Sequence, residues 1–307
     1  MHTEGMGPVR ATSAPGDAAN NWIVCPTPED EPAEQACWFC GAALVGPGAS
    51  RRAREHVFAQ WLLRELGAQK HSFSVSWNDT HEQNVLDQRT MVLDAFVAGR
   101  VCDRCNNGWM SRLEDAVRND LTALADGTRR LEDLTEQASG VLARWAVKTA
   151  FAAQSVALGP KLVPTRHRRA LCAGDLGGVR VVGRLSSVDL GLSTYGMQRW
   201  QVSYPPGARA QVIDAVAQSY KVILTVGRLV LAVCHWPDPT WPMVISRRSH
   251  LAVWPADGTW RTYAYATDRH GVVPDASTEI IDMVVGTIVA HPALADGYLP
   301  MAAVGGR

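Results

Sequence analysis

The sequence predicts an α+β protein, and three observations support that fold class. Two C-x-x-C pairs lie in the first third of the chain, at 37–40 and 102–105. Residues 107–127 and 139–159 have the apolar spacing of helices. Beyond Pro160 the chain changes to short strand-like runs separated by glycine and proline. We therefore expect a cysteine-centred module, then helices, then a mixed α+β domain.

Composition narrows the class of protein further. Of the 307 residues, 47% are apolar and 20% are charged, and the formal net charge is zero. These values are typical of a globular protein, and the charge by itself favours no acidic partner. The first residues do not have the cationic start and apolar core expected of a secretory signal, and no stretch of about 18 apolar residues predicts a transmembrane helix. We expect a cytoplasmic protein without membrane association, in which cysteines are thiols or metal ligands.

The cysteine-centred module is expected to consist of a helix, several short strands and a closing helix, preceded by a disordered leader. Residues 1–34 are rich in glycine, proline and acids and are predicted to be a disordered leader. Residues 57–67 have one apolar helical face, and 71–77 alternate like a strand. Residues 78–88 are polar and are predicted to be a loop, while 90–102 supply one or two strands that lead into the second cysteine pair. The module is expected to end with the helix that stops at Gly127, and so to span residues 35–127.

Residues 128–307 are predicted to form a helical segment and an α+β domain of unknown role. Gly227 and Arg228 stand between two apolar runs and suit a two-residue hairpin turn. The expected strands lie within 177–185, 199–205, 220–236, 250–255 and 260–267, and the expected helices within 205–220 and 277–290.

Four cysteines form the strongest metal signal. They are Cys37, Cys40, Cys102 and Cys105. Two C-x-x-C pairs supply the four thiolates of a closed tetrahedral structural zinc site. The pairs are 61 residues apart, against roughly 15–20 in a simple zinc ribbon, so the intervening segment is expected to be a folded insertion. Cys25 falls in the leader, and Cys172 and Cys234 stand singly among apolar residues, so no function is assigned to these three.

Two further places in the module carry polar side chains suited to catalysis. Glu55 stands directly before His56, and Asn106 directly follows the last predicted zinc ligand. A carboxylate and an amide oxygen suit Mg²⁺ or Mn²⁺, and an imidazole can take a proton from water. The structural interpretation is that Glu55 and His56 only begin a helix. The catalytic interpretation is a one-metal phosphodiesterase site.

The order "CWFC", "EHV" and "CDRCN" resembles the HNH endonuclease family, whose core is a treble-clef ββα-metal unit. The match covers about residues 37–115. The resemblance implies that Glu55 and Asn106 hold a catalytic Mg²⁺ or Mn²⁺ and that His56 is the general base. It also implies that the four cysteines hold a separate structural zinc. The expected reaction is metal-dependent hydrolysis of phosphodiester bonds, with double-stranded DNA as the partner.

The sequence departs from the family pattern in three places. The middle asparagine of the family name has no clear counterpart, and Asn78 and Asn84 are the candidates. Trp109 stands where many members have a basic residue, and Arg112 could replace that residue one helical turn later. Asn107 competes with Asn106 as the metal ligand, and adjacency to the cysteine favours Asn106.

Two basic runs and the tryptophans are candidates for contacts with nucleic acid. The run at 50–54 would lie at the rim of the site, where arginines can hold phosphates, and the run at 165–170 is less well placed. Most of the 11 tryptophans are expected to pack in the core. His71, His81, His235 and His270 lack metal-ligand spacing. The alternative to a nuclease is a non-catalytic zinc module that binds nucleic acid or protein.

Overall fold

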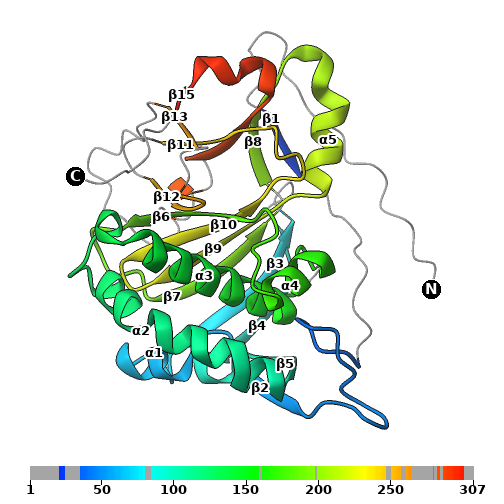
Figure 1. The fold of residues 1–307 in the computed structure, drawn as a ribbon, viewed down its shortest axis with the longest axis vertical. Helices are drawn as coiled ribbons and strands as arrows, with labels where there is room; N and C mark the ends of the chain where they lie inside the picture. Colours follow the sequence, from blue (N-terminus) through cyan, green and yellow to red (C-terminus); the bar gives the residue numbers. More distant parts are fainter. Residues whose placement is uncertain are drawn as a thin grey trace.

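Figure 1 shows the protein as a computed structural model with a cysteine-centred module at one end and two stacked sheets at the other. The structure describes residues 21–24, 35–79, 84–158, 161–197, 199–246, 250–256, 260–263, 279, 282–283 and 286–300. In the part of the chain so described, no helix is long and apolar enough to cross a membrane. The α+β prediction is confirmed.

The module is built on a two-stranded antiparallel sheet of β2 (Arg52–His56) and β5 (Val97–Cys102). The chain between these strands forms a second hairpin and two short helices: α1 (Gln60–Glu65), β3 (Ser72–Asp79), β4 (Asn84–Val92) and η1 (Leu93–Ala95). The insertion therefore leaves the sheet at His56 and returns at Val97, where these two residues pair across the strands.

Helices follow the second cysteine pair, as the apolar spacing predicts. They are η2 (Cys105–Met110), α2 (Ser111–Asp126), η3 (Leu131–Asp133), α3 (Glu136–Val156) and α4 (Thr165–Cys172). Gly127 ends α2 in the left-handed conformation, with φ of 79°, which glycine adopts without steric cost. The segment at η2 is π-helical with a kink at Gly108, so the helix after the last cysteine does not begin as a regular α-helix.

Two sheets form the rest of the described structure, and we call them the sandwich. One has five strands in the order β12-β6-β10-β9-β7: β6 (Arg180–Leu185), β7 (Leu192–Met197), β9 (Tyr220–Val226), β10 (Leu229–His235) and β12 (Leu251–Trp254). The other has six in the order β1-β8-β14-β11-β13-β15: β1 (Asn21–Val24), β8 (Arg199–Ser203), β11 (Met243–Ser246), β13 (Arg261–Tyr263), β14 (Thr287–Ala290) and β15 (Leu299–Pro300).

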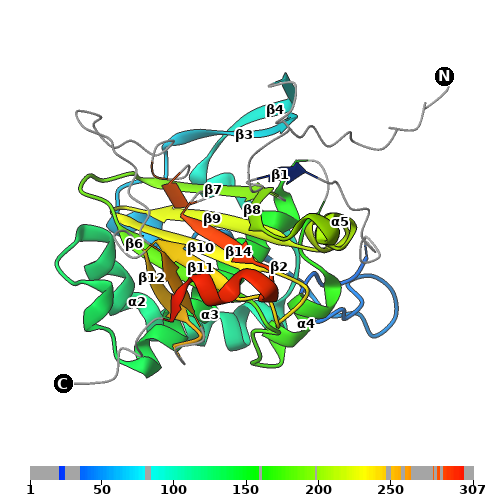
Figure 2. The ribbon, with the colours of Figure 1, turned by 90° about the horizontal axis from the view of Figure 1, so that it is seen from above.

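The sandwich also carries α5 (Arg209–Ala217), beside β1 and β8, and the short helices η4 (Pro206–Ala208) and η5 (Pro292–Gly297). The views in Figures 1 and 2 place α3 across one face of the five-stranded sheet and the six-stranded sheet on the other side. Both β9 and β10 are buried along their whole length, because each face of their sheet is covered.

One hydrophobic core joins the module to the sandwich. It runs from Trp38 and Phe58 through the α3 face that includes Trp145 and Phe151 to Val222 on β9. The apolar residues of α3 therefore pack against the module on one side of the helix and against the five-stranded sheet on the other. A second core fills the space between the two sheets.

Three sequence predictions are wrong in part. Of the predicted loop at 78–88, residues 78–79 belong to β3 and 84–88 to β4, where cross-strand pairing outweighs their polarity, and residues 80–83 lie outside the described part. Residues 287–290 form strand β14 rather than the end of a helix, because Thr287, Ile288 and Val289 are β-branched and pair with β8 and β11. Residues 21–24 of the predicted disordered leader pair with β8. The other residues of that leader up to 34 lie outside the described part.

Candidate metal centre and active site

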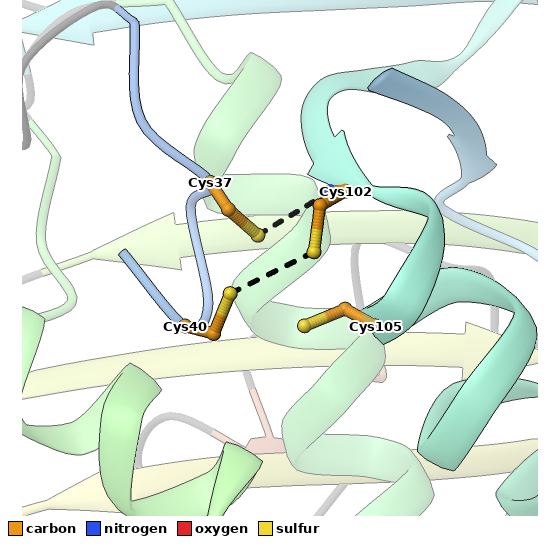
Figure 3. A group of neighbouring side chains, drawn as sticks. All are labelled: Cys37, Cys40, Cys102 and Cys105. Atoms are coloured by element: carbon orange, nitrogen blue, oxygen red, sulfur yellow. Dashed lines mark hydrogen bonds between the residues drawn. The ribbon is translucent and has the colours of Figure 1, made fainter. Parts of the chain in front are cut away.

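The four predicted metal ligands come together at one end of the β2–β5 sheet. Cys37 and Cys40 lie on a tight turn before β2, Cys102 ends β5, and Cys105 begins η2 (Figure 3). All four Sγ atoms lie within 4.8 Å of one another, and those of Cys40 and Cys102 are 3.7 Å apart. Tetrahedral zinc with bonds of about 2.3 Å would separate its sulfur ligands by about 3.8 Å. The cluster could therefore hold one metal ion such as zinc.

The first cysteine pair is fixed by its own turn and by α3. The Cys37 amide donates to the Ala42 carbonyl at 2.8 Å, and Gly41 closes the turn with φ of 77°. The indole of Trp38 donates to the Phe151 carbonyl at 2.9 Å. The pair is thus positioned by contacts that do not involve the thiols, which means that the ligand geometry is preorganised.

Electrostatics within the cluster also suit a cation. The pKa of Cys37 is lowered to about 4, chiefly because the Cys105 thiol donates a hydrogen bond to it, and backbone amides add to the effect. Burial raises the pKa of Cys40 to about 11. The free thiols can therefore share one negative charge, whereas a bound zinc would ionise all four.

A fifth thiol, Cys172, lies beside the cluster. It ends α4, and its Sγ is 4.0 Å from that of Cys105. It stands singly in an apolar run of the sequence, which by itself indicates a small core residue. Only the packing of α4 against the first cysteine pair brings it there, with the guanidinium of Arg168 3.6 Å from the ring centroid of Trp38.

His56 lies at the end of β2 with its side chain partly covered. Its Nε2 is 3.5 Å from Oδ1 of Asp94 and 3.2 Å from the side-chain amide of Gln60. Burial lowers the pKa of His56, while Asp94 works in the opposite direction and Arg54 adds to the lowering. A neutral imidazole with one nitrogen held by a carboxylate is the form that can accept a proton on the other nitrogen.

The carboxylate beside His56 comes from Asp94. Asn78 and Asn84 are at the far end of the β3–β4 hairpin, six residues or about 20 Å along the strand from its base. The base of that hairpin lies next to η1, where the Leu93 amide donates to the His71 carbonyl at 3.0 Å. The residue that contacts His56 is thus an aspartate on η1, and neither asparagine candidate is near.

Glu55 is buried on the opposite face of β2 and is held by a lysine of α3. Its carboxylate forms an ion pair with Nζ of Lys148, which is fully buried, and Nζ is also 2.7 Å from Glu114 on α2. Burial lowers the pKa of Lys148, but the two carboxylates outweigh burial and raise it overall. Burial, together with Glu114, raises the pKa of Glu55. One cation between two anions leaves an excess of negative charge.

Asn106 and Glu55, both within the described residues, form no hydrogen bond with each other. The Asn106 amide donates to Oδ1 of the exposed Asn107 at 3.1 Å, which leaves its own oxygen available. The oxygen donors suit Mg²⁺ or Mn²⁺ in type. However, the carboxylate of Glu55 is engaged by Lys148, so the two residues do not fit an ion site as they stand.

Three other sequence interpretations can be compared with the structure. Trp109 packs edge-on against Phe39, with ring centroids 5.7 Å apart, so this position supports the first cysteine turn and its indole ring faces protein. Arg112 is exposed on the first turn of α2. In the run at 165–170, Arg168 is buried against Trp38 rather than free for phosphate. The run at 50–54 is different, because its three arginines are exposed at the start of β2.

Sequence reasoning missed Asp94, Lys148, Glu114 and Cys172. Only Lys148 gave a signal in the sequence, as a lone charge within the apolar run of α3. His81, His270 and Cys25 lie outside the described residues. A search of known protein families, of curated proteins and of solved structures finds no match to this chain.

Proposed function

We propose that the cysteine-centred module binds one structural zinc and is an HNH-type endonuclease that hydrolyses DNA phosphodiester bonds, with His56 as general base. The observation that carries the proposal is the neutral, partly exposed His56 beside Asp94, on a strand tied by the cysteine cluster to the start of η2. The order of cysteine turn, two-stranded sheet and helix is that of a treble-clef ββα unit, which supports the same proposal.

In this proposal each residue has one task. His56 removes a proton from the attacking water through the ring nitrogen that does not face Asp94, and Asp94 holds the ring and stabilises the imidazolium that forms. Arg54 is close enough to His56 to affect its pKa, and the exposed arginines at 51, 52 and 54 hold the phosphates of the duplex. Because Glu55 is engaged by Lys148, we assign no step to a divalent ion at Glu55 and Asn106, and its presence is a separate question for experiment.

The test is nicking of supercoiled plasmid by the full chain, with and without Mg²⁺ or Mn²⁺. His56→Ala should lower the nicking rate by about 100-fold or more, because a general base contributes 10²–10⁴-fold. The variant should keep its zinc and its affinity for DNA. The matched control is His71→Ala, since His71 is an exposed histidine on the insertion. Equal nicking rates for His56→Ala and wild-type protein would rule out His56 as the base.

The second candidate is a zinc module that binds nucleic acid or protein without cleavage. The observation in its favour is the complete ion-pair cluster of Glu55, Lys148 and Glu114, which occupies a carboxylate that the nuclease would offer to its ion. This candidate predicts no cleavage under any metal condition. It also predicts that Glu55→Gln changes stability alone.

A further inference from the structure

A second candidate site lies in the sandwich, away from the cysteine cluster. It is a cavity of about 710 Å³ between the first turns of α3, the glycine-rich loop at 174–180, the turn after β10, and the end of β12. This volume is within the range of small-molecule sites. The residues that line this cavity do not include His56, its contacts or the cysteine cluster. The cavity is therefore a separate feature of the fold.

Three tryptophans lie in the lining of the cavity. Trp236 and Trp241 are buried with their ring centroids 5.3 Å apart, and Trp254 is partly exposed at the side. A Cβ atom at Gly140 of α3 would lie 3.4 Å from the Trp254 ring, so the helix backbone packs closely against that ring. Tryptophan faces bind planar aromatic rings by stacking.

Two polar side chains in the lining have buried nitrogen atoms that make no well-formed hydrogen bond with the described residues. His235 is 7% exposed, and within the described residues neither ring nitrogen makes a hydrogen bond of acceptable geometry. The Nε atom of Arg144 is also buried without an acceptor, and this arginine forms no ion pair with any described residue. Buried polar groups of this kind are costly unless a bound molecule satisfies them.

The carboxylates of the lining do not neutralise these groups. Asp175 accepts the Gly177 amide at 3.1 Å, and Asp238 accepts the Thr240 amide at 2.9 Å. Each carboxylate therefore closes its own turn. Arg180 adds a second guanidinium to the lining, so the cavity offers cationic groups beside aromatic walls.

His235 is neutral at physiological pH. Burial lowers its pKa to about 3, and His167, with ring centroids 4.2 Å apart, adds to the lowering, while the backbone of Gly178 acts in the opposite direction. A neutral imidazole has one donor and one acceptor. That pair matches the polar edge of a heterocyclic base.

We propose that this cavity binds a nucleotide, with its base against the tryptophans and His235 and its phosphate at Arg144 and Arg180. An apolar ligand would form no hydrogen bonds with Arg144 and His235. A simple inorganic anion would make no stacking contact with the tryptophans. The nucleotide can be free in solution or can be one extruded unit of a nucleic acid strand. Both sources present the same base and phosphate.

The test is calorimetric titration of the full chain with the common nucleoside monophosphates and with the matching nucleosides, without divalent ions. We expect saturable binding of at least one monophosphate and binding of its nucleoside that is about 10- to 100-fold weaker, the range for losing a hydrogen bond to a charged group. Arg144→Gln should weaken the monophosphate to the level of the nucleoside. Arg64→Gln is the control, because Arg64 is exposed on α1 and does not line the cavity.

A second variant protects the test against misfolding. Gln137 is exposed at the rim on the first turn of α3, so Gln137→Trp should fold normally while narrowing the entrance, and it should also weaken binding. Short single-stranded and mismatched duplex oligonucleotides distinguish the two sources. Competition with the monophosphate indicates an extruded nucleotide, and binding of the monophosphate alone indicates a free one.

The result that would overturn the proposal is binding of neither monophosphates nor oligonucleotides at millimolar concentration, or binding that both variants leave unchanged. His56→Ala should bind the nucleotide as wild-type protein does. Because the titration needs neither cleavage nor metal, failure of plasmid nicking and failure of nucleotide binding are separate results.

Discussion

The cysteine-centred module and the sandwich hold their strands in different ways. In the module, β2 and β5 have five and six residues and pair only with each other among the described strands. In the sandwich, β9 and β10 are buried throughout between α3 and the second sheet. A two-stranded sheet is marginal in water, whereas a sheet covered on both faces is stabilised by apolar burial. The comparison indicates that the module depends on its cysteine cluster in addition to the shared core, whereas the sandwich depends on packing alone.

The largest expected effect comes from removing one thiol of the cluster. Cys102→Ser should release the zinc and lower the melting temperature by roughly 10 °C or more, because structural zinc supplies on the order of 10 kcal/mol of binding free energy. Elemental analysis and calorimetry measure both quantities. The control is Cys234→Ala, which removes a buried thiol of the sandwich and should leave zinc content unchanged. Wild-type protein that contains no zinc would contradict the dependence of the module on a metal.

A second, smaller effect is expected at Lys148. Lys148→Met leaves the carboxylates of Glu55 and Glu114 without their cation, which should cost about 3–5 kcal/mol of the free energy of unfolding. The variant should recover part of this loss as the pH falls from 8 towards 5. The pKa of Glu55 is already raised above its ordinary value by burial and rises further without the lysine, so the folded state takes up a proton more readily than the unfolded state.

Denaturant unfolding at several pH values measures this recovery. Adding Glu55→Gln to Lys148→Met provides the matched comparison, because the double variant has one buried carboxylate fewer. Its stability should depend less on pH than that of Lys148→Met alone. An equal dependence in both variants would show that Glu55 is not the group that titrates.

The smallest expected effect is a pH dependence of stability that comes from the buried histidines of α4 and β10. Burial lowers the pKa of His167 to about 4 and that of His235 to about 3, from an ordinary value of 6.5. Groups with lowered folded pKa values contribute stability above the unfolded pKa and lose it as the pH falls. Stability should therefore decrease from pH 6.5 downward. His235→Gln should reduce the slope, as followed by thermal unfolding between pH 7 and 4, whereas His71→Ala should not.

Much of the module could be predicted from local sequence. C-x-x-C spacing restricts both sulfurs of a pair to one turn, so two such pairs indicate one tetrahedral centre, and the cluster is formed by the four predicted residues. Apolar spacing likewise predicted α2 and α3, and the Gly227 turn between β9 and β10 is where the sequence placed it. These features depend on interactions between residues close in sequence or on the fixed geometry of one ligand set.

Tertiary structure alone decided which residues surround the proposed catalytic groups and the cavity. Lys148 reaches Glu55 across 93 positions of the sequence, and Cys172 reaches Cys105 across 67. Asp94 meets His56 only because the insertion folds back on its base. The cavity likewise needs α3, β10 and β12 to be assembled before His235 and Arg144 can face one space. Such contacts follow from the packing of whole helices and sheets. The apolar periodicity of a segment indicates which of its faces is buried, but not which other element covers that face.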